Sequence, residues 1–125
     1  MTADMLAKND IVLEGGLRSL ELCKEAGVKV GYGSDLLGPL QDEQSREFLL
    51  RSEVTPPIEI IRSATTIAAE IIRMDGKLGI VEPGALADLI LVDGDPLKDL
   101  GLFQDQGRCL SLIMKDGRLH KNRLA

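Results

Sequence analysis

The stretch GVKVGYGSD, residues 27–35, decides the fold class of this chain. Its apolar first half has valines at alternate positions, which predicts a buried strand over residues 28–33. Its second half places Asp35 in a glycine-lined turn directly after that strand. Active sites of α/β barrels are built at such strand ends, where side chains leave the rigid sheet and face solvent. The stretch therefore predicts one wall of an α/β active site, with Asp35 as its candidate functional carboxylate.

The residues before this strand predict a helix. Apolar side chains recur at helical spacing over residues 10–26, and Asn9 or Asp10 is placed to cap the start. Gly27 suits the left-handed conformation that ends many helices. Helix, turn and strand in succession form the repeating unit of an α/β fold.

Two more helices are predicted after the strand. The first is polar and covers residues 42–53. The second opens at Thr55, which is placed to cap it ahead of two prolines, and runs to about residue 74. The pattern allows an interruption near Thr65. The apolar stripe expected to face a neighbour consists of Ile58, Ile61, Thr65, Ala68 and Ile72.

Beyond residue 76 the pattern changes to short strands and turns. The predicted strands cover residues 78–81, 87–92, 110–114 and 118–121, and the second is apolar enough to be buried on both faces. Asp116 and Gly117 form the pair that tight hairpins prefer. The chain thus divides into an α/β part, residues 1–76, and a β part, residues 77–125.

Composition excludes several function classes. The chain has 125 residues, a hydrophobic content of 44% and a formal net charge of −5, which disfavours nucleic acid and anionic membranes as partners. Cys23 and Cys109 lack the spacing of a zinc site or a disulfide framework. No apolar run could cross a bilayer, and the first residues do not resemble a signal peptide. These features predict a soluble, cytoplasmic protein.

Two interpretations of Asp35 remain open from spacing alone. It is either a turn carboxylate that bonds nearby amides, or a metal ligand or general base at a strand end. Asp88 is expected to bond local backbone, and His120 to lie on the surface of the final hairpin. Glu43, Glu47 and Glu53 are expected to form a solvated helix face.

Several motifs together resemble the C-terminal part of the amidohydrolase superfamily. They are AGV and GSD within residues 26–35, TPPIEIIRSAT at residues 55–65 and KLGIVEPGALADL at residues 77–89. GDPL at residues 94–97 and MKDGR at residues 114–118 continue the match in the same order. The branch most resembled contains imidazolonepropionase-like and prolidase-like enzymes, including Xaa-Pro and Xaa-Arg dipeptidases.

This resemblance implies a metal-dependent hydrolase of amide or peptide C–N bonds that uses a metal-activated water. Residues 1–76 would be the last part of a (β/α)8 barrel, and residues 77–125 the C-terminal share of a small β-sandwich. Asp35 would lie beside zinc or another divalent metal and take a proton from the attacking water. The family's histidine ligands and bridging lysine have no counterpart here, so this chain alone is expected to bind zinc weakly or not at all and to be inactive.

The resemblance also leaves three hypotheses for this chain. It is a fragment of a hydrolase that acts on a small amide or dipeptide, a non-catalytic oligomeric remnant, or a subunit that another chain complements. Strands without neighbours expose edges and apolar faces, so we expect a homo-oligomer.

Overall fold

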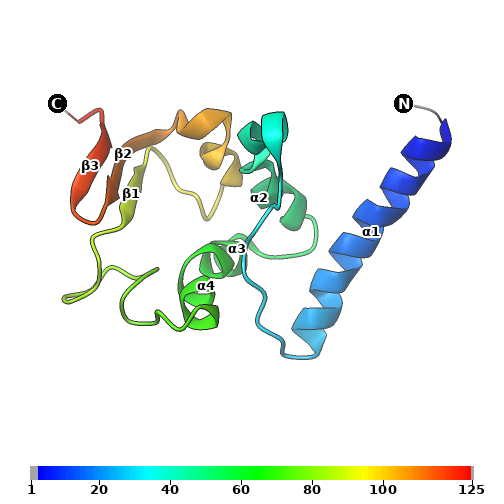
Figure 1. Cartoon of the computed structure of the whole chain (residues 1–125), viewed down its shortest axis with the longest axis horizontal. Helices are drawn as coiled ribbons and strands as arrows, with labels where there is room; N and C mark the ends of the chain where they lie inside the picture. Colours follow the sequence, from blue (N-terminus) through cyan, green and yellow to red (C-terminus); the bar gives the residue numbers. More distant parts are fainter. Residues whose placement is uncertain (1–2, 125) are drawn as a thin grey trace.

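A computed structural model describes residues 3–124, with the side chains of residue 8 and residues 11–124. A long helix and a small sheet lie at opposite ends of the molecule, with short helices between them (Figure 1). The helices are α1 (Ala3–Glu25), α2 (Arg46–Arg51), α3 (Pro57–Ala64) and α4 (Thr66–Ile71), with 3-10 turns η1 (Gly38–Glu43), η2 (Leu100–Phe103) and η3 (Asp105–Gly107). The strands are β1 (Leu89–Val92), β2 (Leu110–Lys115) and β3 (Arg118–Asn122).

Helix α1 is longer than the sequence predicts. It begins at Ala3, so Asn9 and Asp10 lie inside the helix, and the prediction that one of them caps its start is wrong. Their side chains lie outside the described residues. The predicted end is confirmed, because Gly27 has the left-handed φ of 67° that closes the helix.

The predicted strand over residues 28–33 does not form. Figure 1 shows them as a drawn-out segment without helix or strand. Among the described residues, the Tyr32 amide makes the only backbone–backbone hydrogen bond of residues 29–36, to the Ser63 carbonyl at 2.9 Å. A strand needs a neighbouring strand to pair its amides and carbonyls. The described chain places helix α3 beside this segment and no strand, so the extended conformation remains without a sheet.

The two predicted helices after this segment are shorter than expected. The polar helix over residues 42–53 is split into η1 and α2. The next helix is interrupted at Thr65, as the sequence allows, where φ is −128° and ψ is −97°. Thr55 does not cap it, because Pro56 holds the N-cap position in an extended conformation and no side chain bonds there.

The predicted apolar stripe of these helices is partly wrong. Ile60 and Ala69 are the buried apolar residues, whereas Ile58 and Ile72 are 40% and 60% exposed. Ile60 and Ser63 line one cavity together with Val28 and Val30, so this face of α3 is turned towards the extended segment.

The sheet confirms most of the predicted β part. Its three strands are antiparallel in the order β1-β2-β3. Asp116 and Gly117 have φ values of 48° and 72°, which fits the tight hairpin predicted for them. Strand β1 forms an edge of the sheet and is half exposed, so the prediction that it is buried on both faces is wrong.

The predicted strand over residues 78–81 is wrong, and Gly79 gives the physical reason. This glycine has a φ of +70° and lies against the backbone at the break between α3 and α4. A Cβ atom on Gly79 would lie 2.5 Å from the Thr65 carbonyl carbon and oxygen. The segment therefore packs against a helix terminus instead of pairing with a strand.

The three aromatic side chains of the protein join the helical part to the β part. The rings of Tyr32 and Phe48 lie 4.4 Å apart, and those of Phe48 and Phe103 lie 4.6 Å apart. The side chain of Gln104 donates to the Ser45 carbonyl beside them at 2.6 Å. The few aromatic residues in the sequence predict an aliphatic core. Composition does not indicate that all three aromatic rings lie together. Within the described part of the chain, every helix is too short or too polar to span a bilayer.

Candidate functional site

Asp35 lies at the far end of the extended segment and is exposed. Its φ of 51° is left-handed, a conformation that aspartate tolerates better than most residues. Its carboxylate makes no hydrogen bond or ion pair with any residue that the structure describes. The bonds to nearby amides expected of an ordinary turn aspartate are therefore not observed, and the carboxylate is available to solvent or a ligand.

Side chains of helix α2 hold the segment that leads to Asp35. Arg51 Nη2 donates to the Gly31 carbonyl at 3.2 Å, and its guanidinium lies 5.2 Å from the centroid of the Tyr32 ring. The Tyr32 hydroxyl donates to the Gln44 carbonyl at 2.8 Å. The segment is thus fixed by side chains at the positions where a sheet would use backbone bonds.

Arg51 is itself oriented by Glu47. Arg51 Nε donates to Glu47 Oε1 at 2.7 Å, and Nη2 pairs with the same oxygen. The arginine is 9% exposed, which makes it one of the two buried polar residues among those described. Glu47 was expected on a solvated helix face, and this expectation is wrong. The four-residue spacing from Glu47 to Arg51 is the signal in the sequence that could have identified the pair.

Burial next to this pair changes the acidity of Tyr32. Desolvation raises the pKa of its hydroxyl to about 12, and the Glu47 carboxylate adds to the increase. The Arg51 guanidinium and a hydrogen bond to the Phe48 backbone act in the opposite direction. Tyr32 therefore remains a protonated hydrogen-bond donor throughout the physiological pH range.

A cavity of about 580 Å³ lies beside the residues that flank Asp35. Gly33, Ser34 and Leu36 line one wall, and side chains of α1 and α2 line the other. Asp35 is not among the lining residues. The cavity contains both apolar and charged side chains, including Arg46.

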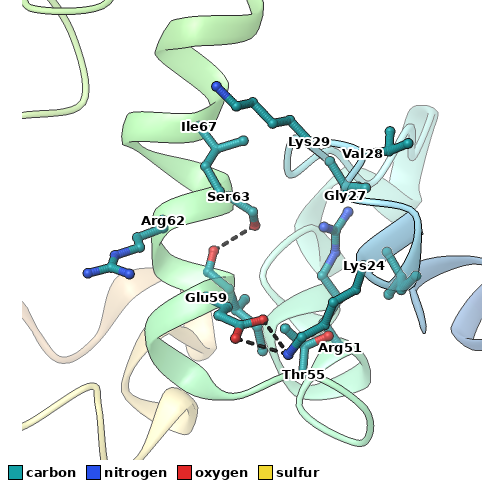
Figure 2. A pocket seen from close by; sticks show the side chains of 13 residues that line it. Lys24, Gly27, Val28, Lys29, Arg51, Thr55, Glu59, Arg62, Ser63 and Ile67 are labelled. Carbon is teal, nitrogen blue, oxygen red and sulfur yellow. Dashed lines mark hydrogen bonds and ion pairs between the residues drawn. The ribbon is translucent and has the colours of Figure 1, made fainter. Parts of the chain in front are cut away.

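A second cavity, of about 390 Å³, lies at the opposite end of the extended segment (Figure 2). Its charged residues are mostly paired: Lys24 Nζ contacts both carboxylate oxygens of Glu59, at 2.8 and 3.0 Å, and Lys29 pairs with Glu70. These pairs attach the start of the segment to α3 and α4. Arg51 also lines this cavity, so its residues hold the segment that leads to Asp35.

The described residues do not form a metal site by themselves. No three His, Cys, Asp or Glu side chains lie close enough together to hold a metal ion in the part of the chain that the structure describes. His120 is exposed on β3, as the sequence predicts. Zinc sites use about three or four protein ligands. Asp35 alone does not fit this requirement.

Comparisons with known proteins are consistent with one family. Residues 1–119 match the sequence model of the amidohydrolase family. The structure superposes on a crystal structure of an amidohydrolase with a TM-score of 0.85 and 51% identity, over 88% of this chain and 27% of that one. It also superposes on a prolidase complexed with N-methylphosphonate-L-proline, with a TM-score of 0.86 and 46% identity, over 98% of this chain and 30% of that one.

The chain is also similar in sequence to a curated protein. The chain is 29% identical to a 5-methylthioadenosine/S-adenosylhomocysteine deaminase from Symbiobacterium thermophilum, over 70% of this chain and 23% of that protein. The chain therefore spans about a quarter of this relative, and less than a third of either solved chain. The similarity to a prolidase confirms the branch that the sequence motifs indicate.

Proposed function

Because this chain belongs to the amidohydrolase family, we propose that it supplies one wall of an active site that hydrolyses C–N bonds. The observation that carries the proposal is the Asp35 carboxylate. It is exposed, lacks a partner among the described residues, and ends an extended segment that buried side chains hold in place. A carboxylate free of structural bonds is available for proton transfer.

In this proposal Asp35 acts as the general base. Its carboxylate takes a proton from the water that attacks the substrate carbonyl carbon, and then gives that proton to the leaving nitrogen. Members of the family are generally metal-dependent, and Asp35 would be one ligand. The remaining ligands would come from outside the described residues, which hold no group of three that could bind a metal.

The proposed substrate is a small dipeptide or a related amide. The support comes from the prolidase to which the structure is similar. Residues 1–76 would contribute the last part of a (β/α)8 barrel with the site. Residues 77–125 would contribute a share of a small β-sandwich that acts as scaffold.

A chimeric enzyme tests the role of Asp35. Residues 1–119 would replace the matching segment of the prolidase that is 46% identical to this chain, and hydrolysis of Xaa-Pro dipeptides would be measured. We expect an active chimera that loses at least about a thousandfold in kcat with Asp35→Asn, since the base is removed. Glu53→Gln, an exposed change, should leave kcat unchanged. Full activity of the Asp35→Asn chimera would exclude the proposed base.

The chain on its own provides the second half of the test. We expect no dipeptide hydrolysis and no retained zinc after dialysis, because Asp35 alone cannot hold the ion. Near-stoichiometric zinc together with hydrolysis would contradict this expectation.

A second candidate function is association without catalysis, as a homo-oligomer. A third is a subunit whose missing metal ligands another chain supplies. Large apolar side chains favour association, since Val12, Leu37 and Val81 are 72%, 75% and 83% exposed. Light scattering at micromolar concentration should show an oligomer. A stable monomer would exclude self-association.

A further inference from the structure

We propose that Arg51 is a positioning residue, whose guanidinium holds the segment that leads to Asp35 through the Gly31 carbonyl and the Tyr32 ring. The consequence for catalysis rests on the function proposed above for Asp35. The anchoring itself can be tested by amide hydrogen exchange, without an activity measurement.

The segment needs an anchor because its backbone has few partners. In a sheet, residues 29–36 would bond to a neighbouring strand along their length. Here the Tyr32 amide makes their single backbone bond to the described residues, to the Ser63 carbonyl. Asp35 is three residues further along, and its own side chain contributes no bond. The position of its carboxylate therefore depends on how firmly residues 31 and 32 are held.

Arg51 contacts these two residues directly. Nη2 donates to the Gly31 carbonyl, and the guanidinium lies over the Tyr32 ring. Tyr32 is in turn held between Arg51 and Phe48, whose ring lies 4.4 Å away. The anchor thus acts on one backbone carbonyl and one side chain that precede Asp35.

The cost of burying Arg51 supports a specific role. A charged side chain that is 9% exposed loses hydration, and this loss is offset only by well-placed partners. Glu47 provides the opposite charge, and the Gly31 carbonyl provides a further acceptor. An ion pair between residues four apart stabilises a helix without being buried. Burial of the Glu47–Arg51 pair therefore points to a role beyond stabilising α2.

The geometry requires arginine and not only a positive charge. Nε and Nη2 both contact Glu47 Oε1, Nη2 also reaches the Gly31 carbonyl, and the planar guanidinium lies over the Tyr32 ring. A lysine ammonium is a single point of charge and lacks this planar fork. Arg51→Lys should therefore fail to restore the anchor, although it preserves the charge.

Amide hydrogen exchange of the full 125-residue chain tests the anchor. In Arg51→Met we expect the Tyr32 amide to exchange at least about tenfold faster, because its bond to Ser63 opens more often. The Asp93 amide, which is bonded to the Cys109 carbonyl in the β part, serves as the internal reference and should not change. Arg51→Lys should resemble Arg51→Met.

The matched control is Arg62→Met. Arg62 is an exposed arginine of α3 that points away from the residues around Arg51 (Figure 2). It should leave both amides unchanged. Unchanged Tyr32 exchange in Arg51→Met, or equal acceleration at Tyr32 and Asp93, would overturn the proposal, since the latter shows general destabilisation.

The prolidase chimera connects the anchor to catalysis. We expect Arg51→Met to lower kcat about tenfold with KM within about twofold, because a displaced base affects the chemical step more than binding. If the Tyr32 amide is released but both Arg51→Met and Asp35→Asn retain full kcat, the anchor stands and the proposed base fails. If Asp35→Asn abolishes kcat and Arg51→Met has no effect on it, the base stands and the positioning role fails.

Discussion

Residues 28–33 and residues 89–92 are both short, apolar and extended, yet only the second stretch belongs to a sheet. Strand β1 pairs with β2, which the tight turn at Asp116 and Gly117 joins to β3. The earlier segment has a helix beside it and is held by the side chains of Arg51 and Tyr32. The difference shows that apolar alternation predicts an extended backbone, whereas a strand also requires a partner within reach.

Two aspartates illustrate the same contrast. Asp35 and Asp116 have nearly equal left-handed φ values, 51° and 48°. Asp116 closes a hairpin, and its amide is bonded to the Asp88 carboxylate at 2.6 Å. Asp35 closes nothing, and its carboxylate lacks a described partner. The same backbone conformation is structural in one region and open to a functional role in the other.

The contact between Gly79 and the break between α3 and α4 should give the largest effect on stability. Gly79→Ala would place a Cβ atom 2.5 Å from the Thr65 backbone at a φ of +70°. We expect a loss of roughly 3 kcal/mol in the free energy of unfolding, from overpacking and from left-handed strain. Chemical denaturation followed by circular dichroism measures this change.

Gly84→Ala is the matched control for that substitution. Gly84 has a φ of +94°, but a Cβ atom there meets nothing within 4 Å. Only the strain remains, so we expect a loss of about 1 kcal/mol. Equal losses for the two variants would show that Gly79 does not pack against the break at Thr65.

The β part was the easier region to predict from sequence. Asp116 and Gly117 specify their own turn, so the hairpin follows from adjacent residues. Residues 78–81 are the exception, because the close approach of Gly79 to Thr65 depends on tertiary packing. For the same reason the burial of Ile60 instead of Ile58 could not be read from helical spacing.

The candidate site was only partly predictable. Asp35 was identified because a carboxylate follows an apolar run and a glycine, and its role remains a prediction. Arg51 was missed, since nothing in the sequence indicates that α2 turns its charged pair towards residues 31 and 32. The hairpin follows from residues next to each other in sequence, whereas the anchor joins Arg51 to Gly31, twenty residues apart.

An alkaline titration examines how tightly the first region is packed. Tyr32 is the only tyrosine and the chain has no tryptophan, so absorbance near 295 nm reports this hydroxyl alone. We expect a midpoint at about 12 in the folded chain and at the ordinary pKa of 10.0 in denaturant. Because the folded pKa is raised, the associated stability is complete below pH 10 and is lost as the pH rises through about 12.

A variant of the Glu47–Arg51 pair tests the cause of the raised Tyr32 pKa. Glu47→Gln should lower the Tyr32 pKa, since a negative charge that opposes ionisation is removed. An unchanged midpoint near 10 in the folded protein would show that the ring is solvated and that the region is looser than the contacts indicate.

The smallest effect on stability is expected at Asp35. Asp35→Asn keeps a side chain that tolerates the left-handed φ and removes a charge without a described partner, so stability should change by less than about 0.5 kcal/mol. Asp88→Asn is the matched control, because that carboxylate accepts the Asp116 amide. Loss of a charge-assisted bond there should cost about 1 kcal/mol. Should Asp35→Asn destabilise the chain as much as Asp88→Asn, the carboxylate at position 35 has a structural partner, and the argument that it is free for proton transfer fails.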